Sequence, residues 1–108
     1  MKLSFNKRLQ EICNQKTNRL CIGLDIDPDY FPLGRDTSIY GMEAFAKEVI
    51  RGTIEFCPVY KPNFAFYERF GSGGYALLER IVDYISGRSL VIADAKRGDI
   101  GNTSRQYA

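Results

Sequence analysis

LVIADAKRGDI, residues 90–100, joins a short apolar run to a cluster of charged residues. The first four residues predict a buried strand, and the charges begin where that strand ends. Because side chains alternate along a strand, Asp94 and Lys96 are expected on the same side, and Asp99 follows three residues later. Two carboxylates and an ammonium group at the carboxyl end of a strand are typical of a catalytic site in a parallel α/β protein.

Upstream of this segment, apolar runs that predict strands alternate with segments of helical spacing. The expected elements are a helix at 5–12 capped by Ser4, a strand at 20–24, a helix at 42–56, a strand at 59–61, a helix at 75–86, a strand at 90–93 and the start of a helix at 100–108. Strands that alternate with helices in this way predict a parallel sheet.

Length and composition restrict the class of protein. The 108 residues suffice for one small domain, and 44% hydrophobic residues is ordinary for a globular protein. A net charge of +2, with the basic residues scattered, argues against a nucleic-acid partner. The sequence contains no apolar run of membrane-spanning length and no signal peptide at its start, so we expect a cytoplasmic protein.

The chain contains no histidine, which excludes Ser-His-Asp and Cys-His nucleophile systems. Cys13, Cys21 and Cys57 are far apart in the sequence and lie among apolar neighbours, so we expect buried, reduced thiols and no metal site. Any chemistry must then depend on carboxylates, amines, guanidinium groups, phenols or the backbone.

Two further segments allow more than one interpretation. The glycine-rich residues 71–74 precede a predicted helix and could hold a phosphate, but we interpret them as a flexible loop because they match no phosphate-binding motif. Phe64, Phe66 and Tyr67 could stack on a base, but an aromatic packing cluster is the favoured interpretation.

The predicted sheet has only three strands, and such a sheet has open edges. The chain ends at Ala108 after about two turns of the last predicted helix. We therefore expect residues 1–108 to be a single incomplete domain of a larger barrel or doubly wound sheet, in preference to a complete small domain.

Each predicted strand ends in a charged residue or is followed by one: Asp25, Lys61, and then Asp94 with Lys96. A single charge in this position is usually solvated or forms a salt bridge. Charges after three successive strands are more informative, because the carboxyl ends of the strands meet at one face of a barrel.

Together these segments resemble the orotidine 5′-phosphate decarboxylase family, in its longer bacterial branch. The matching segments are CIGLD at 21–25, KPNFAFYE at 61–68 and DAKRGDIGNT at 94–103. The resemblance implies a (β/α)8 TIM barrel, an α/β fold of which this chain supplies roughly the first three βα units. It also implies a cofactor-independent enzyme that converts orotidine 5′-phosphate to UMP in pyrimidine biosynthesis.

The resemblance implies a role for each charged residue. Lys96 would stabilise negative charge at C6 of the pyrimidine and protonate that atom. Asp94 and Asp99 would keep Lys96 protonated and in place, and Lys61 would complete an alternating Lys-Asp-Lys-Asp array.

Two more residues have roles that the resemblance alone implies. Asp25 would bind the ribose hydroxyls, although Asp27 and Asp29 lie close and compete for this role. Asp99 and Thr103 are spaced to share a helical face, and in the family the equivalent pair reaches the neighbouring subunit's active site. The expected assembly is therefore a homodimer with shared sites.

Other functions remain open at this point. A 3-keto-gulonate-phosphate-type decarboxylase shares the D-x-K-x-x-D pattern but uses Mg²⁺ and an acidic residue where this chain has Lys61. A non-catalytic nucleotide- or phosphate-binding α/β module would use residues 71–74 as its binding loop. Residues 1–108 alone are expected to be nearly inactive, because loops after strands seven and eight often hold the phosphate in such barrels.

Overall fold

The structure, a computed structural model, describes residues 3–96. Its elements are α1 (Phe5–Lys16), β1 (Cys21–Gly23), the 3-10 helix η1 (Pro28–Tyr30), α2 (Ile39–Thr53), β2 (Val59–Lys61), α3 (Ala65–Glu68), α4 (Gly71–Ile85) and β3 (Leu90–Val91). The helix expected at 100–108 lies outside the described residues. No helix within residues 3–96 is long and apolar enough to cross a membrane.

The three strands form one parallel sheet in the order β1-β2-β3. Cys21 pairs with Val59 and Gly23 with Lys61, and Val59 also pairs with Leu90 on its other side. Helix α2 connects β1 to β2, and α3 and α4 connect β2 to β3. The parallel sheet predicted from the alternation of strands and helices is therefore confirmed.

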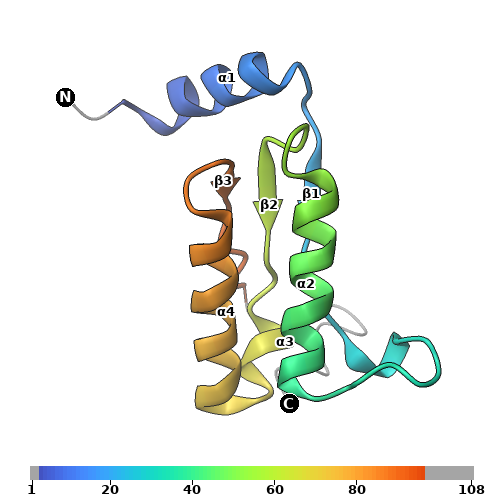
Figure 1. The fold of residues 1–108 in the computed structure, drawn as a ribbon. Coiled ribbons are helices and arrows are strands. Elements are labelled where there is room, and N and C mark those ends of the chain that lie inside the picture. Colours follow the sequence, from blue (N-terminus) through green and yellow to red (C-terminus); the bar gives the residue numbers. More distant parts are fainter. Residues whose placement is uncertain (1–2, 97–108) are drawn as a thin grey trace.

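Helices α2 and α4 lie side by side over one face of the sheet, as Figure 1 shows. Buried residues recur in both helices at intervals of four: Met42, Ala46 and Ile50 in α2, and Leu77, Ile81 and Ile85 in α4. Tyr60 of β2 is fully buried in the same cluster, and its hydroxyl lies 2.5 Å from the Oγ1 of Thr53. This core fixes the strands from one side and so determines where their carboxyl ends lie.

Helix α1 lies across the end of the sheet where the strands begin (Figure 1). It starts after Ser4, as predicted, because the Ser4 Oγ accepts a hydrogen bond of 3.3 Å from the Lys7 amide. It continues beyond the expected end, to Thr17 in the left-handed region at φ 48°. The Lys16 Nζ donates to the Ile54 carbonyl, which ties α1 to the end of α2.

The prediction of a buried first strand with buried cysteines is wrong in part. Ile22 packs against the core, but Cys21 and Gly23 are exposed. Side chains alternate along β1, so these two residues face the side of the sheet opposite α2 and α4. Cys57 is buried as expected, Cys13 is half-buried, and all three thiols are free.

Residues 71–74 do not form the flexible loop that we expected, because they are the first turn of α4. A Cβ on Gly74 would lie 1.8 Å from the Tyr67 carbonyl oxygen, and one on Gly73 would lie 2.9 Å from the Ile39 Cδ1. These glycines therefore allow α4 to approach α3 and α2 closely. Helix α2 also begins earlier than predicted, because Ser38 caps it through the Gly41 amide at 3.3 Å.

Candidate functional site

The carboxyl ends of the three strands bring one row of polar residues together. Gly23 pairs with Lys61, and a further bridge joins Asn63 to Asp94. Asp25 lies two residues beyond Gly23, and Asn63 lies two residues beyond Lys61, so these two residues continue the same pairing. With Asp94, which pairs with Asn63, they form one row on one face of the sheet. The Asp94 amide donates to the Pro62 carbonyl at 3.1 Å, which continues the ladder to this row.

Lys96 and Asp94 form an ion pair in which the Nζ lies 2.5 Å from Oδ2. The prediction that these side chains project to the same side is therefore confirmed. The hydrogen bond from Lys96 holds the pKa of Asp94 below its ordinary value, and the positive charge of Lys61 contributes in the same direction. Asp94 is thus an ionised partner for Lys96.

The pKa of Asp25 depends on the other charged groups at these strand ends. The residue is exposed, but partial loss of water around its carboxyl group raises its pKa. A hydrogen bond from Asn63 lowers the pKa, as do the charges of Lys61 and Lys96, whereas Asp94 raises it. The structure therefore brings together four of the residues that the sequence singled out, from three strand ends.

Asp99 and Thr103, the other two predicted site residues, lie outside the described residues. Asn63 was not singled out from the sequence, although it pairs with Asp94 across the sheet and is only 4% exposed. Strand alternation from Lys61 was the signal that could have placed it on the same face. In the sequence, Pro62 and Asn63 mark the end of the strand and belong to the KPNFAFYE segment of the resemblance, which implies no separate role for them.

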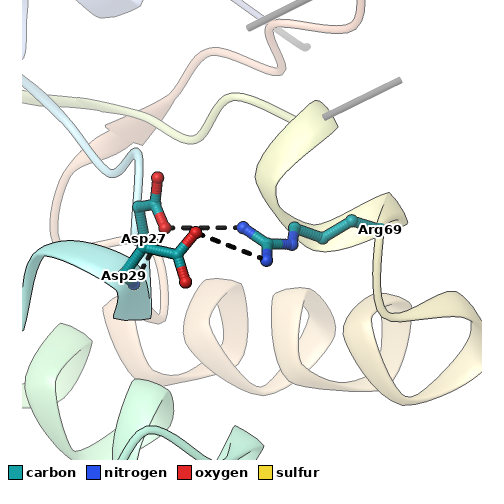
Figure 2. A network of polar contacts seen from close by, with 3 residues as sticks. All are labelled: Asp27, Asp29 and Arg69. Atoms are coloured by element: carbon teal, nitrogen blue, oxygen red, sulfur yellow. Dashed lines mark hydrogen bonds and ion pairs between the residues drawn. The ribbon is translucent and has the colours of Figure 1, made fainter. Parts of the chain in front are cut away.

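The loop after β1 is held by Arg69, which follows α3 (Figure 2). The Asp27 Oδ1 accepts hydrogen bonds from the Asp29 amide at 3.0 Å and from the Arg69 Nη1 at 3.4 Å. The Arg69 Nη2 lies 3.8 Å from the Asp29 Oδ2. Asp27 and Asp29 therefore hold the loop in place, which leaves Asp25 as the acidic residue of this loop that faces the other strand ends.

The aromatic segment after β2 packs in the core next to the charged row. Phe66 and Tyr67 are buried in the core and Phe64 packs against it, which agrees with the predicted packing cluster. The Tyr67 hydroxyl donates a 2.7 Å hydrogen bond to the Leu24 carbonyl, next to Asp25. Burial, followed by the negative charge of Asp25, raises the pKa of Tyr67, so this hydroxyl remains a donor.

Replacement of Tyr67 by phenylalanine is expected to lower the free energy of unfolding by about 1–2 kcal/mol, because a buried carbonyl loses its hydroxyl donor. Urea unfolding would measure the loss. Tyr40→Phe is the matched control, since Tyr40 is 80% exposed and its change should have almost no effect. Equal unfolding energies for the two variants would show that the Tyr67 hydrogen bond does not stabilise the β1 end.

No group of three or more acidic, cysteine or histidine side chains within residues 3–96 is arranged to hold a metal ion. The second strand ends at Lys61, a cation, beside Asp25 and Asp94. The described part of the site is thus a set of alternating fixed charges. Such a set can stabilise developing charge on a bound molecule and can donate a proton from its ammonium groups.

The model of the orotidine 5′-phosphate decarboxylase / HUMPS family matches residues 18–108. This chain belongs to that family. An orotidine 5′-phosphate decarboxylase of Dehalococcoides mccartyi is 41% identical over 106 residues, which cover 98% of this chain and 37% of that protein. That of Porphyromonas gingivalis is 48% identical over 112 residues, covering 98% and 39%. The chain therefore spans a little over a third of the length of these relatives.

Solved structures of the family have the same fold in this region. OMP decarboxylase of Leishmania donovani matches with a TM-score of 0.70 and 35% identity, over 98% of this chain and 38% of the other. That of Plasmodium berghei matches with a TM-score of 0.74 and 26% identity, over 96% and 47%. The predicted family and the predicted TIM-barrel fold, of which this chain forms about a third, are both confirmed.

Proposed function

We propose that this chain supplies the Lys-Asp part of an active site that converts orotidine 5′-phosphate to UMP and CO₂. The observation that carries this proposal is the convergence of Asp25, Lys61, Asp94 and Lys96 at the carboxyl ends of β1, β2 and β3. The relatives that bear the name of this activity, at 41–48% identity, support it.

The chemistry follows from the charges. Loss of CO₂ breaks the bond between C6 and the carboxylate and leaves the electron pair on C6, in the plane of the ring. A fixed cation beside C6 stabilises that pair, and the Lys96 ammonium then transfers a proton to C6 to give UMP. Asp94, ionised and 2.5 Å from the Lys96 Nζ, keeps this ammonium charged and in position.

The remaining predicted roles belong to the same proposal. Lys61 and Asp99 extend the array on either side of the Asp94–Lys96 pair, and Asp25 accepts hydrogen bonds from the ribose hydroxyls. Thr103, with Asp99, reaches the partner's site in a cytoplasmic homodimer. Sedimentation of the enzyme with and without a nucleotide analogue would test the dimer.

Two alternatives have less support. An Mg²⁺-dependent sugar-phosphate decarboxylase needs an acidic residue where β2 ends at Lys61, and the Lys61 ammonium would repel the metal ion. A nucleotide-binding module would use residues 71–74 as a phosphate loop, but Gly73 and Gly74 are packed against α2 and α3.

The experiment needs the rest of the barrel. We define the completed barrel as residues 1–108 of this chain joined to the part of the Porphyromonas gingivalis enzyme that follows the matched region. Loss of orotidine 5′-phosphate absorbance should show turnover by the completed barrel and almost none by residues 1–108 alone. A folded completed barrel that binds UMP without turning over orotidine 5′-phosphate would contradict the proposal.

A further inference from the structure

Asp25 is an exposed residue between buried neighbours in the segment that follows β1. Leu24 before it, and Ile26 and Asp27 after it, are buried. Leu24 and Ile26 both belong to the apolar core. The backbone is therefore anchored on both sides of Asp25, and the polar contacts of its neighbours show which elements anchor it.

The contacts before Asp25 come from β2 and α3. The Leu24 amide donates to the Lys61 carbonyl at 3.0 Å, and the Leu24 carbonyl accepts from the Tyr67 hydroxyl at 2.7 Å. Tyr67 belongs to α3, which packs so closely on α4 that a Cβ on Gly74 would lie 1.8 Å from the Tyr67 carbonyl oxygen. A tightly packed part of the fold therefore holds the backbone before Asp25.

The contact after Asp25 comes from the same short segment as Tyr67. The Arg69 Nη1 lies 3.4 Å from the Asp27 Oδ1. The Arg69 guanidinium also lies over the Phe70 ring, 4.9 Å from its centroid, and Phe70 packs against the core. Figure 2 shows the guanidinium directed from the end of α3 toward the loop. The ion pair thus joins the loop after β1 to the segment that also carries Tyr67.

The charge of Asp27 needs an explanation, because its side chain is only 7% exposed. Burial of a carboxylate is costly unless the charge is paired. The Asp27 Oδ1 also caps η1 by accepting from the Asp29 amide at 3.0 Å. An asparagine oxygen would accept the same hydrogen bond, so the cap alone does not require a charge. What the carboxylate adds is the ion pair with Arg69.

We propose that Arg69 is a positioning residue that, through its ion pair with Asp27, fixes the backbone around Asp25 for the ribose hydroxyls of the substrate. The inference rests on the proposed function, because Asp25 is assigned there to the ribose. Tyr67 and Arg69 hold the backbone on either side of Asp25. Arg69 acts through Asp27 and is not a catalytic residue.

Arg69→Met tests this role in the completed barrel. Methionine keeps an apolar chain against Phe70 but removes the partner of Asp27. UMP carries the ribose and is not turned over, so its Kd should increase about tenfold, equivalent to the loss of one good hydrogen bond. KM for orotidine 5′-phosphate should rise by a similar factor with a smaller change in kcat, because the ribose contact is present in both the ground state and the transition state.

Two milder variants cover the case in which Arg69→Met does not fold. Asp27→Asn keeps the acceptor for the Asp29 amide but loses the charge, so the Kd for UMP should rise by less than in Arg69→Met. Arg69→Lys keeps a cation near Asp27 without the forked guanidinium, and its Kd should lie nearest to that of the unsubstituted protein. Unchanged UMP affinity in both Asp27→Asn and Arg69→Met would overturn the proposal.

A double substitution shows whether Arg69 acts through Asp25. In Asp25→Ala the ribose contact is already absent, so the addition of Arg69→Met should cause little further change in the Kd for UMP. If Arg69→Met weakened UMP binding equally in both backgrounds, its effect would not depend on Asp25. That result would overturn the positioning role.

Arg80→Met is the matched control. The Arg80 Nε lies 2.6 Å from the Glu43 Oε1, and this ion pair joins α4 to α2, neither of which contributes a residue to the candidate site. The variant should leave the Kd for UMP unchanged, whatever small loss of stability it causes. An Arg69→Met protein that lost stability but bound UMP normally, as expected of Arg80→Met, would contradict the proposal.

Hydrogen exchange keeps this test separate from that of the proposed function, because it needs no turnover. The Asp29 amide donates to the Asp27 Oδ1, and the Tyr30 amide donates to the Asp27 carbonyl at 3.1 Å. Both amides should exchange faster in Arg69→Met than in the unsubstituted protein, and at the unsubstituted rate in Arg80→Met. Faster exchange together with weaker UMP binding would support the positioning role even if the completed barrel released no CO₂. Unchanged exchange in Arg69→Met would overturn it, whatever the enzyme does.

Discussion

Lys96→Ala is expected to lower kcat/KM of the completed barrel by at least about 10⁴-fold. The substitution removes both the cation beside C6 and the proton donor to C6, and each contribution alone is commonly worth about 10²–10³-fold or more. Asp94 would lose the ion pair that it makes with the Lys96 Nζ at 2.5 Å, which leaves an unopposed carboxylate near the substrate carboxylate. Loss of orotidine 5′-phosphate absorbance would measure the effect.

Lys47→Ala provides the matched control for charge removal. Lys47 forms a 2.8 Å ion pair with Glu43 within α2, away from the strand ends, so its loss should leave kcat/KM unchanged. Binding of UMP to Lys96→Ala should survive, because the phosphate and ribose contacts remain. A Lys96→Ala enzyme that kept more than about a tenth of the activity would exclude Lys96 as the proton donor.

Gly74→Ala is expected to lower the free energy of unfolding by about 3 kcal/mol. The new Cβ would lie 1.8 Å from the Tyr67 carbonyl oxygen and 2.7 Å from its carbon. Both atoms belong to the Tyr67 backbone, so the clash cannot be relieved by the movement of a flexible side chain. The same residue also makes the hydrogen bond to Leu24. Urea unfolding of the completed barrel would measure the loss.

Gly52→Ala is the matched control, because it is expected to stabilise the protein where Gly74→Ala destabilises it. Gly52 lies in α2, and a Cβ there would meet nothing within 4 Å. Alanine loses less backbone entropy than glycine on folding, so this change should stabilise the protein by about 0.5–1 kcal/mol. If both variants gained stability, α4 would not be packed as closely on α3 as the structure indicates.

Local signals in the sequence determined much of the fold. The alternation of apolar runs and helical segments predicts the βαβαβ order, because each pattern depends on residues three or four positions apart at most. The cap at Ser4 is also local, and so is the end of α4, where Ser86 and Gly87 both have positive φ. The same applies to the Asp94–Lys96 pair, which is two residues apart on one strand end.

Only the tertiary structure decided which distant residues meet. Asp27 and Arg69 are 42 residues apart, and no periodicity in the sequence relates them. Residues 71–74 look like a flexible loop in isolation, yet they form a helical turn because Gly74 fits against the Tyr67 carbonyl. Likewise, the exposure of Cys21 depends on which face of β1 the helices cover.

The residues of the charged site were likewise determined partly by the sequence and partly by the tertiary structure. The sequence by itself identified Asp25, Lys61, Asp94 and Lys96, because each lies at the carboxyl end of a predicted strand and the strands are parallel. The burial of Asn63 in this row required the pairing of Asn63 with Asp94 and the turn at Ala65, whose amide donates to the Asn63 Oδ1. Register and amide orientation depend on packing between segments, so only the folded chain could determine them.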